Sequence, residues 1–451
     1  MLCAYSGLPN RFIEIVLVVV SLVVLSGCTH SRPEAAANCE LPAYKMLPSS
    51  LDNQRRAGAA PTFSQVLRDA LQARKTQVGR PARREVLMLS GGSQHGAFGS
   101  GLFRGLPKVP EYDVVTGVST GALMSTPLFL ANQDAPKDRA YPSYVKADPR
   151  LGSPGQSNVS DLALAYAISQ ESDLLHVRGS GIGSALLSGS IATFEPLRRL
   201  LEALISEDTI RSVADEANKK KRKLFVGVTN LDDGYGYAVD LTQLATEAVS
   251  SGSISTARQC YIDALLASAS VPPGVGPISL KLKGQASPNL FMDGGARYGV
   301  FFDQLGGVVT ADEPADVTLV VNGSLYGESW TDKQGQPVTK WSVLNLGFRA
   351  IDLLENQVYR LSVADQEEWA TRPGSSLKVA FISNEGLTKM PMSADDWKFN
   401  GETCADARRR DQQKSAPVEF YPSYMRCLID YGQARGSSDP WNKVIVGKAQ
   451  P

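Results

Sequence analysis

The sequence predicts an α/β protein with a mostly parallel central sheet. Short apolar runs alternate with helix-like segments from residue 84 onward, as expected where parallel strands are joined by helical crossovers and buried on both faces. The first two runs each end in a glycine-rich turn, which suits a strand that turns sharply into a helix. A chain of 451 residues with 43% apolar side chains is also large enough to bury an extensive core.

The elements can be predicted in order along the chain. A strand over residues 85–89 leads into a helix over 98–106, and a strand over 112–118 leads into a helix over 120–132. In both cases an apolar run stops at glycines and gives way to helical spacing. Later strands are expected over residues 224–229, 317–321 and 378–382, and later helices over 161–175, 194–205, 261–267 and 341–368.

The N-terminus predicts export and lipid attachment. Its apolar stretch, residues 15–25, is too short for a membrane span of roughly 20 residues. It ends in Leu25-Ser26-Gly27-Cys28, which resembles a bacterial lipoprotein signal in which residues 1–27 are removed and Cys28 is lipidated. Thr29 follows the cysteine where an aspartate would favour the inner membrane. We therefore expect a protein of the bacterial cell envelope, anchored in the outer membrane and facing the periplasm, with an ordinary secretory signal as the alternative.

The rest of the chain divides into three predicted parts. Residues 28–80 mix Ala, Pro, Gln and Arg and predict a tether with one short lead-in helix over 63–74. Residues 81–390 hold the alternating elements and form the expected main domain. Residues 391–451 are expected to be a C-terminal extension that packs on it.

Export implies an oxidising environment for the remaining cysteines. After removal of the signal and acylation of Cys28, the chain retains Cys39, Cys260, Cys404 and Cys427. Four cysteines allow three pairings, and the sequence does not choose among them. We expect a disulfide between Cys404 and Cys427, with two free thiols as the alternative.

Charge and loops narrow the possible partners. Lys plus Arg (46) equals Asp plus Glu (46), so no overall field would attract nucleic acid. No spacing of His, Cys or Asp predicts a metal site, and no motif predicts a cofactor. The basic run at residues 219–223 predicts the exposed end of a helix, with contact to lipid phosphates as the alternative. Loops over residues 134–157 and 178–190 are long enough to form the rim of an active site.

A candidate nucleophile follows the second predicted strand. In Gly117-Val118-Ser119-Thr120-Gly121, glycines flank the serine at minus two and plus two. Placed at a sharp strand-to-helix turn, this pattern exposes a strained serine hydroxyl. The sequence therefore predicts a serine hydrolase with Ser119 as its nucleophile and Gly117 and Gly121 as the glycines of the turn.

A serine hydroxyl needs a base, and histidine is the usual one. The chain has only His30, His95 and His176, and no histidine lies late enough for the usual order of serine, acid, histidine. We expect His95 and His176 to be structural or rim residues. A carboxylate could act instead: Asp293 ends a short apolar run and is followed by Gly294 and Gly295, and burial would raise its pKa towards that of a general base.

The glycine-rich turn after the first strand predicts an oxyanion hole. Gly91, Gly92 and Ser93 precede a predicted helix, and backbone N–H groups at a helix N-terminus stabilise the negative charge that develops on a substrate carbonyl oxygen. The same turn lacks the Lys-Ser/Thr of a P-loop and the glycine spacing of a dinucleotide site.

These motifs, in this order, resemble those of the patatin-like phospholipases. Gly91 to Gly96 matches the family's oxyanion turn, Gly117 to Gly121 its nucleophile motif and Asp293 to Gly295 its D-G-G motif, while residues 264–272 are similar to the segment before the aspartate. The resemblance covers roughly residues 84–325. It implies a three-layer α/β/α fold, a Ser119–Asp293 dyad without histidine, no cofactor, and hydrolysis of acyl esters in membrane phospholipids or lysophospholipids.

Two residues depart from the family pattern. Ser93 stands where the family has a third glycine, and His95 stands where it has Arg or Lys. A serine still supplies a backbone N–H, so the oxyanion hole can persist, whereas loss of the cation affects rate and substrate preference. Two alternatives therefore stay open: a non-catalytic lipoprotein that serves as a scaffold or partner-binding module, and an esterase or acyltransferase for small or non-lipid acyl groups.

Overall fold

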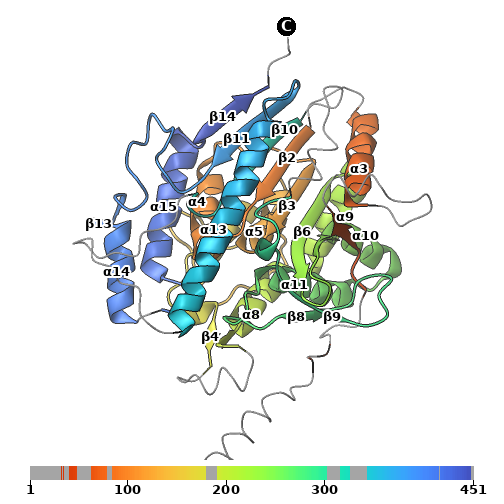
Figure 1. Ribbon diagram of the computed structural model, residues 1–451, viewed down its shortest axis with the longest axis horizontal. Helices are drawn as coiled ribbons and strands as arrows, with labels where there is room; N and C mark the ends of the chain where they lie inside the picture. Colours follow the sequence, from red (N-terminus) through yellow and green to blue (C-terminus); the bar gives the residue numbers. More distant parts are fainter. Residues whose placement is uncertain are drawn as a thin grey trace, which may run out of the picture.

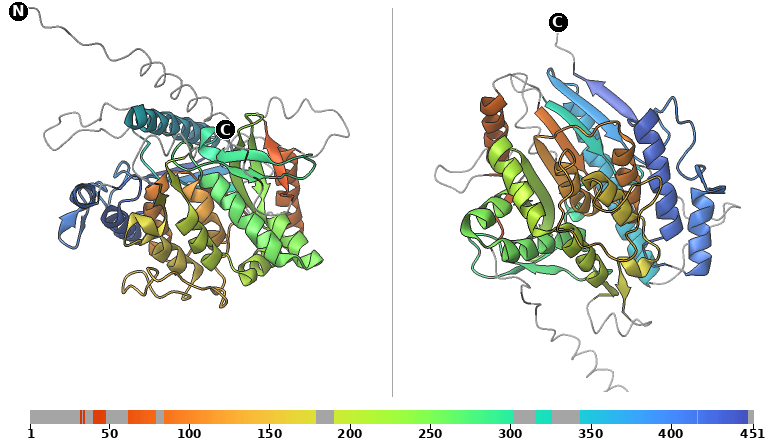
Figure 2. Two further views of the ribbon diagram at one scale, coloured as in Figure 1. Left: turned by 90° about the horizontal axis from the view of Figure 1, so that it is seen from below. Right: turned by 180° about the vertical axis from the view of Figure 1, so that it is seen from behind.

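The protein folds as a sheet between two layers of helices (Figure 1 and Figure 2). The computed structural model describes residues 32, 34, 40–47, 62–78, 84–178, 190–301, 315–325, 343–415 and 417–447. Within these residues, no helix is long and apolar enough to cross a bilayer.

The centre of the sheet is parallel, as predicted. Its five central strands lie in the order β6-β3-β2-β10-β11, and each adjacent pair among them is parallel. Antiparallel strands complete the edges, with β7 and β1 beyond β6 and β14 beyond β11. The strands are β1 (Ala43–Met46), β2 (Arg84–Leu89), β3 (Val114–Val118), β6 (Lys223–Asn230), β7 (Gly236–Asp240), β8 (Ile278–Leu280), β9 (Asn289–Asp293), β10 (Ala315–Val320), β11 (Ser375–Ala380) and β14 (Lys443–Val446).

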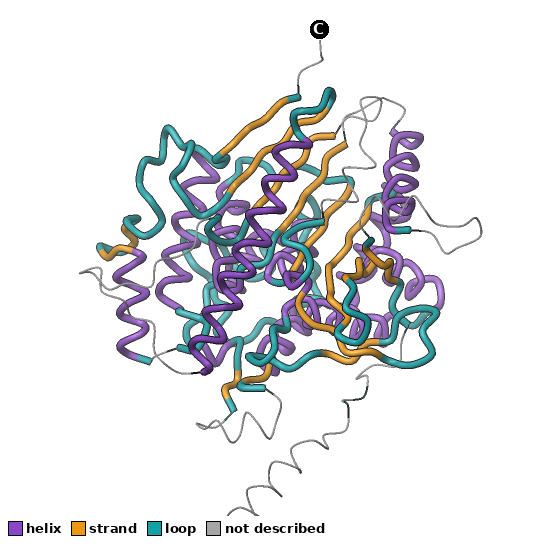
Figure 3. The backbone as a smooth tube through the Cα atoms, in the orientation of Figure 1, coloured by secondary structure: helices purple, strands orange, loops and turns teal. Residues whose placement is uncertain are grey.

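Both faces of the sheet are buried, which explains the continuous apolar runs in the sequence. In β2, Leu87 and Leu89 belong to one core cluster, whereas Val86 and Met88 belong to the other, because successive side chains of a strand point to opposite faces. On the second face α13 lies over the strands and runs roughly along them, and α3 packs near their edge (Figure 3). Their bounds are α3 (Phe63–Val78) and α13 (Val343–Trp369).

The larger helical layer covers the other face and holds the predicted crossover helices. The helix expected over 161–175 starts earlier, because the Ser157 side chain accepts a hydrogen bond from the Ser160 N–H and caps the helix there. The layer comprises α4 (Gly96–Gly105), α5 (Thr120–Phe129), α6 (Asn158–Tyr166), α8 (Glu195–Leu204), α9 (Glu207–Lys220), α10 (Leu241–Ser251), α11 (Ile254–Ala269) and α15 (Pro422–Ser438).

The predicted tether contains part of the fold. Residues 43–46 form β1, which pairs with β7 from Ala43 opposite Val239 to Met46 opposite Gly236. The expected lead-in helix is present as α3, and its residues Phe63 and Leu67 are fully buried. The tether interpretation of residues 28–80 was therefore too broad. Cys28 and His30 lie outside the described residues.

The C-terminal residues are integrated into the main domain. Strand β14 joins the sheet beside β11, and α15 packs against α4 at very short range. A Cβ on Gly101 of α4 would lie 2.1 Å from the carbonyl oxygen of Ile429, and one on Gly432 of α15 would lie 2.2 Å from that of Phe98. The helices approach this closely because Gly101 and Gly432 have no side chains.

A disulfide joins Cys404, at the start of α14 (Cys404–Lys414), to Cys427 in α15, with an S–S distance of 1.96 Å. Cys260 in α11 is also disulfide-bonded. The bond between Cys404 and Cys427 fixes α14 against α15. Both helices contribute to the wall of the main cavity.

The basic run at the end of α9 has a structural role. Lys219, Lys220 and Lys223 form ion pairs with Asp215, Glu111 and Asp240 at 2.8, 2.7 and 2.8 Å. The buried Arg222 pairs with Glu216 at 2.6 Å. The run lies at the end of α9, and four of its five cations form ion pairs within the fold.

Candidate active site

Strand β6 brings the candidate nucleophile and base together. Along one edge it pairs in parallel with β3 as far as Val118, which lies opposite Gly227. The next position on β6, Val228, lies opposite Asp293 of β9, which runs in the reverse direction. Because β7 occupies the other edge of β6, β3 and β9 end head to head on the same edge. Ser119 and Asp293, 174 positions apart (293 minus 119) in the chain, meet at this point.

Ser119 has the backbone conformation expected of a nucleophile at a sharp turn. It follows β3 directly, precedes α5 and has φ 54° and ψ −126°. The turn needs both flanking glycines: a Cβ on Gly117 would lie 2.4 Å from the Gly121 carbonyl oxygen, and one on Gly121 would lie 2.4 Å from the Leu89 carbonyl oxygen. The Ser119 N–H donates to the Ser268 hydroxyl at 3.0 Å, which holds the turn against α11.

The Asp293 carboxyl group is placed to accept a proton. The Ser119 side chain interacts with it and favours its charged form, and the Gly295 N–H donates a hydrogen bond to its Oδ1 at 2.6 Å. The Asp293 N–H donates to the Ser270 carbonyl oxygen at 2.8 Å. Asp293 is 2% exposed, and burial raises its pKa from 3.8 to about 7, against the opposing effects of the Ser119 side chain and the Gly295 N–H. A carboxyl group with such a pKa can exchange protons near neutral pH.

Gly91, Gly92 and Ser93 form the turn between β2 and the short helix η1 (Ser93–His95). Gly92 has φ 141°, and a Cβ there would lie 1.4 Å from the Asn322 carbonyl oxygen. A Cβ on Gly91 would lie 3.0 Å from the Ser119 Cβ, so the turn packs directly against the nucleophile. No hydrogen bond from the three backbone N–H groups is found within the described part of the chain. These groups are therefore available to a ligand beside Ser119.

A large cavity opens at this point. It has a volume of about 2240 Å³ and is lined by Ser119, Asp293, Gly92 and Ser93. Pockets for small ligands typically measure about 300 to 1000 Å³, so this cavity has room for a larger molecule. The loop over 134–157, predicted as a rim, does not line it. Most of the loop over 178–190 lies outside the described residues.

Comparison with known proteins identifies this region. The family model described as patatin-like phospholipase matches residues 87–305, which include the glycine-rich turn, Ser119 and Asp293. The chain contains a patatin-like phospholipase domain. The match to this domain supports a lipid acyl hydrolase.

Other comparisons add little to this assignment. The crystal structure of VipD from Legionella pneumophila is a similar structure with 14% sequence identity and a TM-score of 0.28, and the match covers 92% of this chain and 72% of VipD. Curated protein sequences give no significant match.

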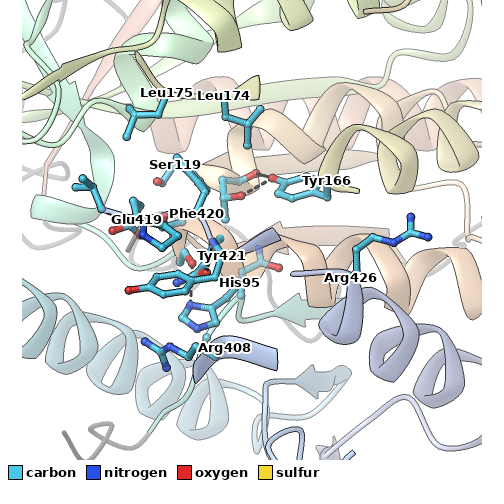
Figure 4. Close-up of a pocket in the computed structure, with 18 of the residues that line it drawn as sticks. His95, Ser119, Tyr166, Leu174, Leu175, Arg408, Glu419, Phe420, Tyr421 and Arg426 are labelled. Carbon is cyan, nitrogen blue, oxygen red and sulfur yellow. Dashed lines mark hydrogen bonds between the residues drawn. The ribbon is translucent and has the colours of Figure 1, made fainter. Parts of the chain in front are cut away.

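The cavity of the patatin-like domain has an apolar end and a charged end. Figure 4 shows Leu174 and Leu175 on one side of Ser119 and Tyr421 and Arg408 on the other. At the apolar end, α8 contributes further leucines. The lining residues there include Leu162, Leu174, Leu175, Phe194, Leu197, Leu200, Leu201 and Leu204, and those at the charged end include Arg349, Asp352, Glu355, Arg408, Glu419 and Tyr421.

A segment of the C-terminal region, residues 417–421, forms one wall of the cavity beside Ser119 (Figure 4). The backbone N–H groups of residues 418, 419 and 420 donate to the Glu171 carboxylate at 3.1, 2.7 and 3.0 Å. The Tyr421 N–H donates to Gln94 Oε1 at 3.2 Å. These bonds fix the segment to the helical layer on one side and to the turn after β2 on the other.

This wall accounts for one departure from the family pattern. Ser93 has φ 48°, which a glycine would adopt at lower cost, and its side chain interacts with the Glu419 carboxyl group and lowers the pKa of that group. Burial within the cavity raises the pKa of Glu419, and the nearby Asp352 acts in the same direction. Ser93 therefore provides a link between the turn and the C-terminal segment that a glycine could not.

The two described histidines have the structural or rim positions that we predicted. His95 Nδ1 lies 3.1 Å from the Gly92 carbonyl oxygen, and its ring packs edge-on against Tyr424. His176 is exposed in β4 (His176–Val177), which pairs with β5 (Ala192–Thr193). Within the described residues, no group of three or more His, Cys, Asp or Glu side chains is arranged to hold a metal ion.

Three residues near Ser119 were not predicted from the sequence. Glu355 and Tyr359 of α13 and Glu419 before α15 all line the cavity. Burial raises the pKa of Glu355, and the neighbouring Asp293 adds to the shift. Each of the three belongs to a stretch without a recognisable motif, and each reaches the site only through the packing of α13 or of the segment before α15.

Proposed function

We propose that the protein is a serine acyl-ester hydrolase that cleaves phospholipids or lysophospholipids through a Ser119–Asp293 dyad. The observation that carries this proposal is that β3 and β9 end side by side on β6 and so bring Ser119 to the buried Asp293 carboxyl group, whose pKa the Ser119 side chain lowers. It supplies a nucleophile and a base in contact, at a turn that matches the family's nucleophile motif.

The reaction would proceed in two steps. Ser119 Oγ attacks the ester carbonyl carbon while Asp293 accepts the hydroxyl proton, and backbone N–H groups of Gly91, Gly92 and Ser93 stabilise the oxyanion. The tetrahedral intermediate collapses, Asp293 returns the proton to the leaving alcohol, and an acyl-enzyme remains. A water molecule then attacks the acyl carbonyl with Asp293 as base, and the fatty acid leaves as Ser119 regains its proton.

The shape of the cavity supports a substrate with one acyl chain on one side of the ester and a polar group on the other. The apolar end, with Leu174, Leu175 and Leu200, suits a hydrocarbon chain, which is stabilised by about 0.8 kcal/mol per buried CH₂. The charged end, with Arg408, suits a polar head group. A phospholipid or lysophospholipid has both parts.

The proposal can be tested by fatty acid release. Purified protein should release fatty acid from phospholipid or lysophospholipid in mixed micelles. Ser119→Ala, which removes the nucleophile, should lower the rate by at least about 10³-fold while leaving the thermal unfolding temperature close to that of the wild type. Equal turnover by the wild type and Ser119→Ala would eliminate the proposal.

We also propose that the enzyme is anchored to the bacterial outer membrane through lipidated Cys28 and faces the periplasm. The support is the sequence before Cys28 and the match to a family that acts on lipids. Cys28→Ala should move the protein from the membrane fraction to the soluble fraction. Turnover of a soluble short-chain ester should not change, since the cavity is untouched. A wild-type protein in the soluble fraction, or a variant that stays on membranes, would contradict anchoring.

A further inference from the structure

Tyr359 places a phenol hydroxyl at the meeting point of the oxyanion turn, the nucleophile and the base. A Cβ built on Gly91 would lie 2.4 Å from the Tyr359 hydroxyl oxygen and 3.0 Å from the Ser119 Cβ. These two atoms are therefore at most 5.4 Å apart (2.4 plus 3.0 Å). A Cβ on Gly295 would lie 3.5 Å from the same hydroxyl oxygen and 3.0 Å from Asp293 Oδ1.

The position of Tyr359 is fixed by the packing of α13. Tyr359 is 7% exposed and belongs to the core cluster under this helix. Gly299 allows the close approach, because a Cβ there would lie 2.9 Å from Tyr359 Cδ1 and 3.0 Å from its Cα. Tyr359 lines the same cavity as Ser119. The phenol is thus held rigidly, which is the condition for a preorganised donor.

The electrostatic surroundings keep this hydroxyl protonated. Burial raises the pKa of Tyr359 well above its ordinary value, and the carboxyl groups of Glu355, Asp293 and Asp352 act in the same direction. A neutral phenol is therefore present throughout the pH range in which the enzyme would work. It can donate a hydrogen bond without adding a charge beside the Asp293 carboxylate.

We propose that Tyr359 is a further catalytic residue, whose hydroxyl donates a hydrogen bond to the oxyanion of the tetrahedral intermediate formed on Ser119. This inference rests on the proposed acyl-ester hydrolysis. It also supplies a donor at a turn where His95 replaces the family's Arg or Lys. The phenol would complement the backbone N–H groups of Gly91 and Gly92 from the opposite helical layer.

The test is Tyr359→Phe, which keeps the ring and removes only the hydroxyl. If the donor acts on the oxyanion, kcat and kcat/KM for a soluble ester should fall together by about 10²-fold with KM nearly unchanged. The pH at half-maximal rate should stay where it is in the wild type. Tyr298→Phe is the matched control, because the Tyr298 hydroxyl donates to the Met46 carbonyl oxygen at 2.9 Å, at the β1 edge, and its loss should leave kcat unchanged.

Other outcomes would overturn the assignment. A kcat for Tyr359→Phe equal to that of Tyr298→Phe would exclude a catalytic role. A shifted pH midpoint with an unchanged maximal rate would show that the hydroxyl acts on Asp293 instead. If Tyr359→Phe unfolds at a much lower temperature than Tyr298→Phe, rates measured well below that temperature still decide the question. Wild-type turnover and its loss in Ser119→Ala test the proposed function separately, so failure of the Tyr359 prediction leaves that function standing.

Discussion

Ser119 occupies a backbone conformation that costs free energy. A non-glycine residue at φ 54° and ψ −126° is strained by about 1 to 3 kcal/mol. The strain persists because β3, the two flanking glycines and the hydrogen bond to Ser268 hold the turn from three sides. In return the hydroxyl faces the cavity and the Asp293 carboxyl group instead of the following helix.

The pKa of Asp293 fixes the direction of the pH dependence. The base acts when ionised, and burial raises its pKa to about 7, so the reactivity of Ser119 should rise with pH through about 7 and level off above it. The stability of the fold changes with pH in the opposite direction. Between the ordinary pKa of 3.8 and about 7 the folded state holds a proton that the unfolded chain has lost, so this contribution to stability is present at low pH and is lost as the pH rises.

At the scale of the elements, the packing of α15 against α4 positions residues 417–421, which form one wall of the cavity. Both helices carry a Gly-x-x-x-Gly pattern, Gly101 with Gly105 and Gly432 with Gly436, and each of these glycines lies against the backbone of the other helix. Residues 417–421 lead directly into α15. The distance between α4 and α15 therefore sets how far Glu419 and Tyr421 lie from Ser119.

Gly432→Ala should separate the two helices. The new Cβ would meet the Phe98 carbonyl oxygen at 2.2 Å, and overpacking of this kind typically costs about 1 to 3 kcal/mol. We expect a lower free energy of unfolding and slower turnover, measured by denaturant unfolding and ester hydrolysis. Gly347→Ala is the control, since nothing lies within 4 Å of its Cβ position in α13 and alanine favours a helix. Equal destabilisation by both substitutions would argue against the close contact.

At the scale of the whole molecule, the fold was predictable where chemistry and periodicity coincide. The alternation of apolar runs with helix-like segments indicated the parallel strands. Ser119 and Asp293 could be predicted because few residue types can act as nucleophile or base in acyl transfer. β1 was missed because four residues in a polar stretch give too little pattern. The glycine pattern that joins α4 to α15 was present in the sequence and could have indicated their contact.

The remainder of the site depends on packing between distant parts of the chain. Tyr359 reaches Gly91 only because α13 lies over the sheet opposite α4, and Glu419 reaches Ser93 only because Glu171 fixes its segment. In each of these contacts, one of the two residues lies outside the matched residues 87–305. A family pattern restricted to that region cannot indicate them.

The central claim is that Asp293 activates Ser119, and covalent labelling by a fluorophosphonate tests it most directly. The account predicts labelling of the wild type at Ser119, with a rate that rises with pH through about 7, no labelling of Ser119→Ala, and labelling of Asp293→Asn slowed by about 10² to 10⁴-fold. Wild-type protein that is folded but not labelled, or Asp293→Asn labelled at the wild-type rate, would contradict the account.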